Sequence, residues 1–537
     1  MAEQAGNAVL SVFDKTGIED FARELSALGW RIYASGGTAE AIKKSGTAVT
    51  DTAELSGGGS ILGHKVVTLS REIYAGLLAD DTLEQAEELK RLNIPRIDLV
   101  CVDMYPLKQA IEDGASEAEV IEKTDVGGPT LLHAAAKGRR IVLSRPQQRS
   151  EVLDWLKAGK PDEEEFRKKL AAVAEYEVTN YILKSAIYLG DGQTLGFIGE
   201  RLSAPDYGEN PWQGNAGLYI ERDNDDPLSI GKFEQIEGIE PSYNNFTDVD
   251  RLLQTITHAA ASFAKNNKKV PVLALGAKHG NLCGAAYGDD PIKTVQKMLD
   301  GDLRAIFGGS VIINTNISRE VAEAVMTYKI EKGKRILDIV MAPSVDEDAL
   351  ELLKRKNGKL RVLTNPALAG LDEQSLDAAL RSRYVRGGRL VQDNYTYVID
   401  CSSPDVEKHG EPPTSEQMND MQLAWAVGST SNSNTICIVK GGMLISNGAG
   451  QQDRVTAAEL ALMRARNAGH ETKGASAYSD SFFPFTDGPE LLADAGIKAI
   501  LTTRGSVKDG VVVETLVKAG VSFCTFPDKQ ARGFYAH

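Results

Sequence analysis

Short apolar runs alternate with helix-like segments through the first 160 residues, and this alternation constrains the fold more than any other feature. Residues 8–13 and 31–34 read as strands, and each leads through a turn rich in Gly, Ser or Thr into a segment with helically spaced apolar residues. A third strand is expected at 97–104 and a long charged helix at 163–189. This order predicts a parallel α/β domain, in which ligands gather at the carboxyl ends of the strands.

The length of 537 residues exceeds what one hydrophobic core supports, so several domains are expected. A stretch rich in Gly, Pro and turn residues at 190–208 marks the boundary, which predicts one domain at 1–200 and a second region at 201–537. The second region also mixes α and β, with a helix expected to begin at Thr247 and to stop at Asn266 and Asn267. A duplication of two similar subdomains is compatible with this region, but the sequence alone does not show it.

The charge balance narrows the class of partner. The formal net charge is −15, which argues against non-specific binding to nucleic acid or to an anionic membrane, but not against a small anionic substrate. No apolar stretch approaches the length of a membrane span, and no signal peptide is recognised at the N-terminus. The five cysteines lack zinc-type spacing, so no metal site is predicted, and a cytoplasmic location is expected.

Two turns that follow the first two expected strands carry groups suited to a phosphate. Lys15 and Thr16 offer an ammonium and a hydroxyl, while Ser35, Gly37 and Thr38 offer hydroxyls and open backbone amides near a helix N-terminus. Each turn alone also fits an ordinary helix cap. Two such turns on consecutive strands favour a nucleotide site.

Three further residues suggest proton transfer in this domain. Tyr105 ends the third expected strand, Asp125 precedes two glycines, and Lys137 ends an alanine run. A carboxylate and an ammonium can set each other's pKa and share a proton. A purely structural ion pair is the alternative.

The pair Lys278 and His279 carries the strongest chemical signal in the second region. It lies between an apolar run at 270–277 and a Gly-rich turn. A reaction that removes a proton while stabilising negative charge needs an ammonium beside a proton acceptor. The alternative is a solvated loop at a strand end, since charged residues are mostly exposed.

Ten motifs in order give the chain a family resemblance over nearly its whole length. They are SVFDKTG, ASGGTAEAI, DMYPL, EKTDVGGPTLLHAAAKG, DYGENPWQ, SYNNFTD, GAKHGNLCGAA, IFGGSVI, GAGQQDRV and SDSFFPF. Together they resemble the bifunctional AICAR transformylase/IMP cyclohydrolase family of purine biosynthesis. The resemblance implies an N-terminal methylglyoxal-synthase-like domain and a C-terminal transformylase region of two cytidine-deaminase-like α/β subdomains. It also implies homodimers with transformylase sites across the subunit interface, and formyl-tetrahydrofolate as co-substrate.

The resemblance also implies residue roles. In the first domain it places Tyr105, Asp125 and Lys137 in the catalytic group, and the nucleotide-holding positions are Lys15, Thr16, Ser35, Gly37, Thr38, Lys65 and Thr68. In the second region His279 is the general base for the AICAR amine, and Lys278 stabilises the transition state. The positions that resemble AICAR contacts are Tyr207, Asn245, Gly308, Asp338, Lys356, Asn434, Phe482 and Arg532. Those that resemble the folate site are Arg454, Pro484, Phe485, Asp487 and Ser506, and a structural potassium ion is expected near Asp480.

Four positions depart from the family pattern. Val67 stands where a lysine resembles part of the first site, and Asp103 stands where asparagine is typical. Asp206 replaces an arginine that resembles a phosphate ligand, and Trp212 replaces a histidine. A lost charge-assisted contact costs roughly 1.5–3 kcal/mol. The sequence therefore leaves three hypotheses open: a bifunctional enzyme, a diverged transformylase or enzyme of altered substrate with cyclohydrolase activity in doubt, and a non-catalytic relative that binds nucleotide or folate.

Overall fold

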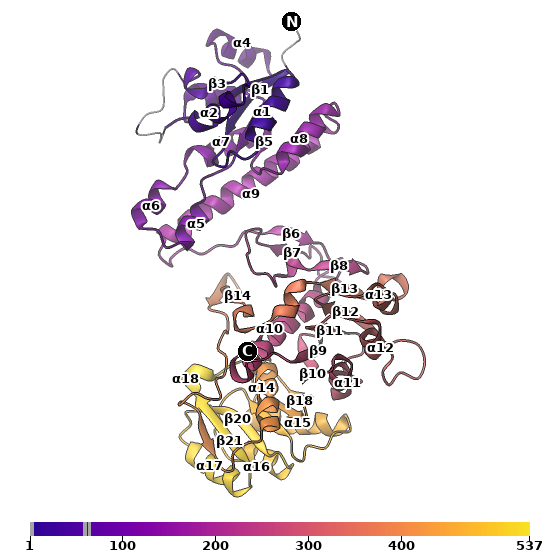
Figure 1. Ribbon diagram of the computed structural model, residues 1–537. Coiled ribbons are helices and arrows are strands. Elements are labelled where there is room, and N and C mark those ends of the chain that lie inside the picture. The colour runs from indigo at the N-terminus through magenta and orange to yellow at the C-terminus, as the bar shows by residue number, and fades with distance from the viewer. Residues whose placement is uncertain (1–4, 57–61, 63–65, 537) are drawn as a thin grey trace. The chain divides into compact units, whose positions relative to one another are not determined.

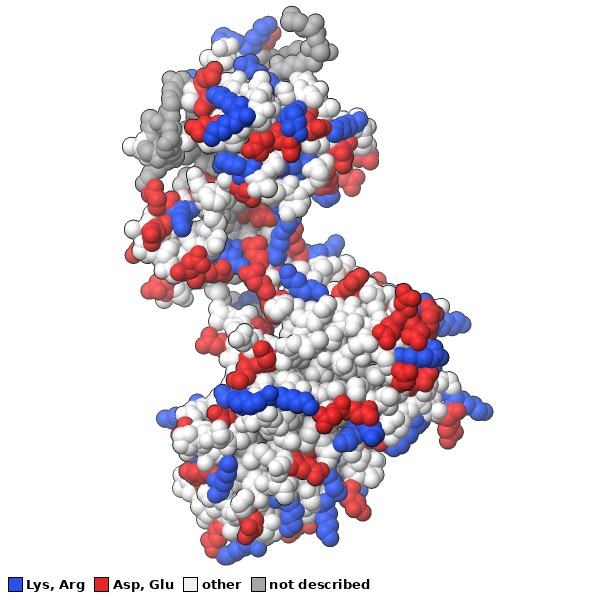
Figure 2. All heavy atoms as spheres, in the orientation of Figure 1, with Lys and Arg blue, Asp and Glu red and all other residues white. Residues whose placement is uncertain are grey.

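The structure is a computed structural model that describes residues 5–56, 62 and 66–536. The chain divides into two compact units, residues 1–198 and 199–537 (Figure 1). None of the helices in the described residues combines the length and the apolar character needed to cross a membrane. Acidic and basic side chains are interspersed over the visible face of each unit (Figure 2).

The first unit contains a five-stranded sheet in the order β3-β2-β1-β4-β5, and every pairing in it is parallel. The predicted parallel α/β domain is therefore confirmed. Its strands are β1 (Gly6–Ser11), β2 (Trp30–Ala34), β3 (Thr50–Asp51), β4 (Leu99–Val102) and β5 (Ile141–Leu143). Its helices are α1 (Ile18–Ala27), α2 (Gly36–Lys44), α3 (Arg71–Leu78), α4 (Leu83–Arg91), α5 (Leu107–Glu112), α6 (Glu117–Glu122), α7 (Gly127–Lys137), α8 (Gln148–Lys157) and α9 (Glu163–Leu189).

Apolar residues on the strands and on the inner helix faces form the core of this unit. Val9, Leu99 and Val142 of the sheet are fully buried together with Leu25 of α1 and Leu132 of α7. Because all five strands run in one direction, the turns after β1, β2, β4 and β5 meet at one edge of the sheet. This edge holds most of the residues predicted for the first site.

The second unit is built on a twelve-stranded sheet in the order β16-β21-β20-β19-β17-β18-β10-β9-β11-β12-β13-β8. The strands on one side are β8 (Glu234–Glu237), β9 (Val272–Lys278), β10 (Asn281–Gly288), β11 (Gly309–Ile313), β12 (Leu337–Ala342) and β13 (Arg361–Thr364). Those on the other are β16 (Glu407–His409), β17 (Ile436–Lys440), β18 (Met443–Gly448), β19 (Ser476–Ser479), β20 (Ala499–Arg504) and β21 (Ser522–Pro527). Two small ribbons lie outside this sheet, β6 (Glu200–Ser203) with β7 (Leu218–Ile220) and β14 (Arg381–Val385) with β15 (Gly388–Gln392).

The two halves of this large sheet share one topology. In each, a hairpin is followed by a strand antiparallel to its first arm, and then by two parallel strands: β9–β13 in one half and β17–β21 in the other. The halves join where β10 pairs antiparallel with β18. The structure thus shows the internal duplication that the sequence left open.

Two long helices, α10 (Tyr243–Asn267) and α14 (Ser415–Ser429), pack against one face of the sheet and against each other. Trp425 of α14 and Phe263 of α10 are buried in the core that they share with the sheet. The remaining helices of this unit are α11 (Pro291–Gly301), α12 (Arg319–Thr327), α13 (Glu347–Leu353), α15 (Arg454–Asn467), α16 (Asp487–Asp494), α17 (Asp509–Lys518) and α18 (Asp528–Ala531).

Helix α10 begins at Tyr243 and not at Thr247 as predicted. Ser242 and Asn245 form a capping box, in which the Ser242 hydroxyl accepts from the Asn245 amide and the Asn245 side chain accepts from the Ser242 amide. This box satisfies two amides that the first turn leaves without helical partners. The Thr247 hydroxyl instead donates back to the carbonyl of Asn244 inside the helix.

Candidate functional site

The turn between β1 and α1 folds its predicted phosphate ligands onto itself. The Lys15 ammonium donates to the carbonyls of Val12 and Phe13, and the Thr16 hydroxyl donates to Asp14 at 2.7 Å. Partial burial lowers the pKa of Lys15, and the nearby Asp103 carboxylate opposes that shift. The predicted ligands of this turn therefore already have partners within the protein.

The turn after β2 lies beside the turn after β1. The Thr38 hydroxyl exchanges hydrogen bonds with the backbone of Val12, and Ser35 contacts Ser11 at 2.8 Å between their hydroxyl oxygens. A Cβ on Gly37 would lie 3.8 Å from the side chain of Lys15. The structure thus brings together the five residues predicted in these two turns.

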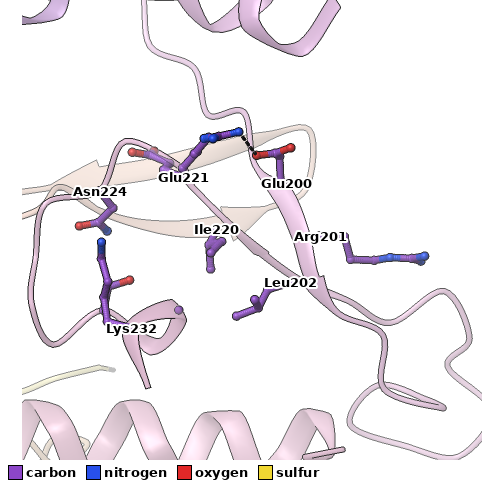
Figure 3. Close-up of a pocket in the computed structure, with 10 residues that line it drawn as sticks. Glu200, Arg201, Leu202, Ile220, Glu221, Asn224 and Lys232 are labelled. Atoms are coloured by element: carbon purple, nitrogen blue, oxygen red, sulfur yellow. Dashed lines mark ion pairs between the residues drawn. The ribbon is translucent and has the colours of Figure 1, made fainter. Parts of the chain in front are cut away.

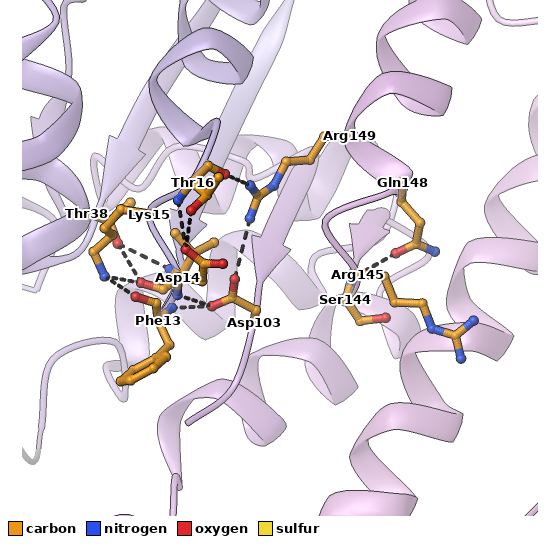
Figure 4. A network of polar contacts seen from close by, with 11 residues as sticks. Phe13, Asp14, Lys15, Thr16, Thr38, Asp103, Ser144, Arg145, Gln148 and Arg149 are labelled. Atoms are coloured by element: carbon orange, nitrogen blue, oxygen red, sulfur yellow. Dashed lines mark hydrogen bonds and ion pairs between the residues drawn. The ribbon is translucent and has the colours of Figure 1, made fainter. Parts of the chain in front are cut away.

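Asp103 is the central acceptor of the first site (Figure 4). One of its oxygens accepts from the amides of Phe13 and Asp14, the second of these at 3.2 Å, and the other lies 3.5 Å from the guanidinium of Arg149. Arg149 also donates to the Thr16 carbonyl at 2.8 Å. Burial raises the pKa of Asp103, while the two amides, Arg149 and Lys15 oppose that shift.

Thr68 and Asp125 both lie next to Gly127 at the start of α7. Asp125 accepts from the Gly128 amide at 3.0 Å, and burial raises the pKa of this carboxyl. A Cβ on Gly127 would lie 3.1 Å from the Thr68 hydroxyl and 3.9 Å from Asp125. Tyr105 lies in the neighbouring turn after β4, and its half-exposed ring makes an edge contact with Phe13 at 5.2 Å.

One residue predicted for this site, Lys137, is not part of the cluster. Lys137 ends α7, so a helix length of about 15 Å separates it from the end of that helix next to Asp125. It lines a separate hollow of about 1730 Å³ together with Asp80, Arg96 and Arg140. Lys65 lies outside the described residues.

In the second unit, Lys278 and His279 form part of the tight turn between β9 and β10. Lys278 pairs with Asn281 across the hairpin, so His279 and Gly280 are its two turn residues, with φ of 55° and 67°. Positive φ at both central residues is the geometry of a type I′ hairpin. His279 is exposed, and the Lys278 ammonium donates to the carbonyl of Phe307.

A buried carboxylate on α10 holds this turn. Asp248 accepts from the Gly280 amide at 2.7 Å, and the Ser310 hydroxyl of β11 donates to its other oxygen at 3.4 Å. Burial raises the pKa of Asp248, and the hydrogen bond from Gly280 and the proximity of His279 oppose that shift.

Three other predicted AICAR contacts lie at the same edge of the sheet as Lys278. Gly308 precedes β11, and a Cβ there would lie 4.0 Å from the Lys278 ammonium nitrogen. Asp338 is at the start of β12 and pairs with Arg355 at 3.4 Å, and the exposed Lys356 follows directly. The structure thus groups Lys278, Gly308 and Asp338 on neighbouring strands.

Of the AICAR contacts predicted on α10 and in the loop before it, one is exposed and one has a structural role in the helix cap. Tyr207 is exposed, and its loop reaches α10 through a hydrogen bond from Asn244 to the Glu209 carbonyl. The side chain of Asn245 is committed to the helix cap. Asp206 and Trp212 of this loop are exposed.

The rest of the predicted residues lie at the carboxyl ends of β19–β21 and near the start of β17. Arg454 pairs with the fully buried Asp480, and burial lowers the pKa of Arg454 to about 10. Arg532 pairs with Asp528 and lies 5.6 Å from the centre of the Phe482 ring. The Asn434 side chain donates to the Gln451 carbonyl at 3.0 Å.

Some of the residues predicted for the folate site are exposed. Pro484 and Phe485 are exposed, and Phe485 is 62% exposed. Asp487 begins α16, while the Ser506 hydroxyl accepts from the Lys508 amide. Asp480, where a potassium ion was expected, faces the Arg454 guanidinium, and the described residues contain no group of three or more His, Cys, Asp or Glu side chains suited to a metal.

The pairing register places both groups of the second unit at one edge of the sheet. From β9 the order runs through β10, β18 and β17 to β19, and successive antiparallel pairs bring the Lys278 end of β9 level with the end of β19. Four strand spacings separate β9 from β19, about 19 Å across the sheet. Lys278 and Asp480 are thus on the same edge but far apart within one chain.

The second half of the sheet repeats the Lys278 turn without its histidine. Lys440 ends β17, and Gly441 and Gly442 form the turn with φ of 59° and 77°. Asp420 of α14 accepts from both of these glycine amides at 2.8 Å, as Asp248 of α10 does from Gly280. Because β10 and β18 are antiparallel, this second turn lies at the opposite edge.

Two protein-family models match consecutive segments of this chain. A model described as MGS-like domain matches residues 17–130, and one described as AICARFT/IMPCHase bienzyme matches residues 135–464. The bifunctional purine biosynthesis protein PurH of Persephonella marina is 32% identical over 96% of this chain and 97% of that protein. The protein of the same name from Staphylococcus carnosus is 35% identical, with the same coverage of both chains.

The chain belongs to the AICARFT/IMPCHase bienzyme family. The resemblance drawn from the ten motifs is thereby confirmed. The PurH protein of Prochlorococcus marinus, another member, is 34% identical, again over 96% of this chain and 97% of that protein. A crystal structure of ForH is 34% identical, with a TM-score of 0.31, and the match covers 35% of this chain and all of the ForH chain.

A pocket of about 400 Å³ in this bienzyme lies apart from the predicted residues (Figure 3). The β6–β7 ribbon and residues 224–232 line it, with Arg222 and Glu200 4.0 Å apart. None of the residues predicted for either site is among those that line it.

Two buried residues at the candidate sites were missed by reasoning from the sequence. Arg149 lies at the start of α8, which follows β5. A search for basic residues after each strand of the parallel sheet would have found it. Asp248 lies inside the SYNNFTD motif, but its role depends on contact with a turn that follows 32 residues later.

Proposed function

We propose that this protein carries out both reactions of its family in de novo purine biosynthesis. The second unit transfers the formyl group of formyl-tetrahydrofolate to the amine of AICAR, and the first closes formyl-AICAR to inosinate with release of water. Membership of the bienzyme family supports both activities. The observation that carries the transformylase assignment is the Lys278–His279 turn, held over the buried Asp248 at an open sheet edge.

The geometry of this turn suits formyl transfer. The exposed imidazole of His279 takes a proton from the AICAR amine while the amine nitrogen attacks the formyl carbon. The Lys278 ammonium stabilises the negative charge that develops on the formyl oxygen. As the bond from the formyl carbon to the folate nitrogen breaks, the proton passes to tetrahydrofolate, so atoms and charge balance.

We propose that a second copy of the chain completes the transformylase site. The 19 Å or so between β9 and β19 leaves Arg454, Phe482 and Arg532 too far from Lys278 for one chain to surround both substrates. The β14–β15 hairpin supports a homodimer, because Tyr384 and Leu390 on it are 73% and 61% exposed. By the pairing register these two side chains lie on opposite faces of the ribbon, so each face presents an exposed apolar residue that a partner chain would cover.

For the first unit we propose slow ring closure. Thr68 and Asp125 both lie within 4 Å of the position of a Cβ on Gly127, and the Tyr105 backbone hydrogen-bonds to Asp125, which fits proton transfer to the leaving water. Val67 brings no cation, however, and Lys15 is bonded within its own turn. A transformylase with weak cyclohydrolase activity is therefore the second candidate function. We also propose a cytoplasmic location, for which the five free cysteines give support.

The decisive test is a two-part absorbance assay on the purified protein. One reaction receives AICAR and formyl-tetrahydrofolate, and the other receives formyl-AICAR alone. Release of tetrahydrofolate with formation of inosinate is expected. Folate turnover without ring closure would leave the transformylase only, and no turnover in either reaction would overturn the proposal.

Matched variants assign the activity to its turn. His279→Gly should abolish formyl transfer while nucleotide binding persists, and glycine suits the positive φ of this position, so the turn should still form. Lys278→Ala should also be inactive, whereas Lys440→Ala at the repeated turn should keep full activity. Equal losses in both lysine variants would remove the Lys278 turn from the mechanism.

A further inference from the structure

The acceptor at the centre of the first site is itself an anion. Asp103 accepts from two consecutive backbone amides, those of Phe13 and Asp14, and its second oxygen faces Arg149. Consecutive amides beside a guanidinium are the arrangement that proteins use to hold a phosphate or a carboxylate. In this chain a side chain already fills that position.

Arg149 is placed for an anionic ligand. Its side chain is 9% exposed, and its NH1 and NH2 groups donate to Thr16 and face Asp103. Its buried Nε has no hydrogen-bond partner among the described residues. The Cys101 thiol also interacts with this guanidinium. A thiol is a weak acceptor, so an anion at this turn would be the stronger partner for a buried guanidinium. Figure 4 shows Arg149 directed at the β1–α1 turn from α8.

We propose that Asp103 competes with the anion of the nucleotide for the same binding groups, because its carboxylate occupies the Phe13 and Asp14 amides and Arg149. An anionic substrate then binds the first site only when it displaces the Asp103 carboxylate or when that carboxyl group is protonated. This inference rests on the proposed function, because it concerns the site assigned to ring closure. It names Asp103 as the residue that limits affinity there. The Arg149 guanidinium is then shared between the carboxylate and the substrate.

The charges around Asp103 define how this competition depends on pH. Lys15 faces it from the β1–α1 turn, Cys101 from β4 and Arg149 from α8, while the Asp14 carboxylate of the same turn accepts from Thr16 and contributes only its amide to Asp103. Burial raises the pKa of Asp103, so the carboxylate takes up a proton at a higher pH than an exposed aspartate does. Anion binding should therefore strengthen as the pH falls. Asp125, whose pKa is also raised by burial, adds to the same trend.

The test measures the binding of inorganic sulfate by calorimetry on the full-length protein, since sulfate keeps both charges between about pH 5 and pH 8. Asp103→Asn removes the charge but keeps an oxygen that can accept from both amides. Sulfate should bind this variant about ten to a hundred times more tightly than the parent at pH 7.5, as expected for removal of one charge-assisted contact. In the parent protein, sulfate should bind more tightly as the pH falls. The change of affinity with pH should be smaller in Asp103→Asn, and the part that remains there is attributed to protonation of Asp125.

Asp98→Asn is the matched control. Asp98 also accepts a backbone amide, that of Asn7 at 3.0 Å, and also pairs with an arginine, but it lies at the other end of β4. Its replacement removes the same charge and should leave sulfate binding unchanged. Equal gains in both variants, or no gain in Asp103→Asn, would overturn the proposal.

Two further measurements keep the inference separable from the proposed function. The pH series on the parent protein needs no variant, and a flat series would overturn the inference even if Asp103→Asn failed to fold. Ring closure of formyl-AICAR is assayed in parallel. Tighter sulfate binding in an Asp103→Asn protein that never closes the ring would support the competitor and refute the cyclohydrolase assignment.

Discussion

The carboxylate of Asp248 accepts a hydrogen bond from the amide of Gly280 at 2.7 Å, and this contact joins α10 to the turn that presents His279. The hydroxyl of Ser310 donates to the same carboxylate from β11. Helix, hairpin and neighbouring strand are thus connected through one buried side chain. The position of His279 depends on this residue, which itself does not touch the substrate in the mechanism proposed.

Replacing Asp248 should therefore reduce formyl transfer through the position of the turn. Asp248→Ala leaves the Gly280 amide without its acceptor, which costs roughly 1–3 kcal/mol, and kcat should fall at least about tenfold, with a smaller change in KM. Asp248→Asn keeps an acceptor and should recover most of the rate. Steady-state kinetics with both variants distinguish positioning from simple loss of charge.

Asp420→Ala is the control for this prediction, because Asp420 holds the repeated turn at the opposite edge. It should lower the melting temperature but leave kcat unchanged in the folded fraction. A rate loss as large as that of Asp248→Ala would mean that general destabilisation explains both.

Val67→Lys should raise cyclohydrolase activity. Residue 67 precedes Thr68, whose hydroxyl lies beside the Asp125 turn, so a lysine there adds an ammonium near the proposed proton-transfer group. One charge-assisted contact corresponds to roughly ten- to hundredfold in rate. The assay is inosinate formation from formyl-AICAR, with Val66→Lys as the control that adds the same charge one residue away. No gain, or the same gain from both variants, would contradict a specific loss at this position.

Arg454→Ala should destabilise the protein as well as weaken folate binding. Asp480 is fully buried, and removal of Arg454 would leave its charge without a partner, which typically costs about 3–5 kcal/mol. The double variant Arg454→Met with Asp480→Asn should recover much of the stability without restoring activity. Chemical denaturation measures the first effect and the KM for formyl-tetrahydrofolate the second. Full stability of Arg454→Ala would refute the structural role of the pair.

His258 should make the second unit sensitive to acid. Its ring is fully buried and contacts two carbonyl oxygens, of Gln254 and Tyr395; these hydrogen bonds favour the charged form, but burial dominates and lowers the pKa to about 4 from an ordinary value of 6.5. The unfolded chain therefore binds more protons between these values. The free energy of unfolding should fall as the pH drops through 6.5 toward 4, by up to about 3 kcal/mol.

The measurement for His258 is denaturant unfolding at pH 7 and at pH 5. His258→Gln cannot take up the proton and should lose less stability on acidification than the parent protein. His133→Gln, which removes an exposed histidine paired with Glu175 in the first unit, is the control and should keep the parent slope. An unchanged slope in His258→Gln would exclude His258 as the source of the acid sensitivity.

Local patterns in the sequence predicted the parallel sheet of the first unit and the helix over Glu163–Leu189, because apolar spacing reports secondary structure directly. The start of α10 was misplaced, since Thr247 and Ser242 are both suitable caps and only the reciprocal contact with Asn245 decides between them. The twelve-stranded sheet was out of reach, because its halves join through the pairing of β10 with β18, residues far apart in the sequence.

The predicted site residues show the same limit. Lys15, Thr16, Ser35, Gly37 and Thr38 come together because parallel strands end at one edge, which a sequence pattern can anticipate. Lys137 was grouped with Asp125 because a carboxylate and an ammonium can share a proton, and the family resemblance agreed. Only the length of α7 shows the distance between them. Asp103 was identified as a departure from the family pattern, but its hydrogen bonds to the Phe13 and Asp14 amides could be seen only in the fold.

The two hairpin turns of the second unit separate architecture from reactivity. Each ends a strand with lysine, bends through two residues of positive φ and is fastened by an aspartate from its own long helix, yet only one of them contains an imidazole. One turn geometry therefore occurs in this chain both with and without an imidazole. The backbone of the hairpin gives a rigid support, and the residue that it carries decides whether the support can take part in chemistry.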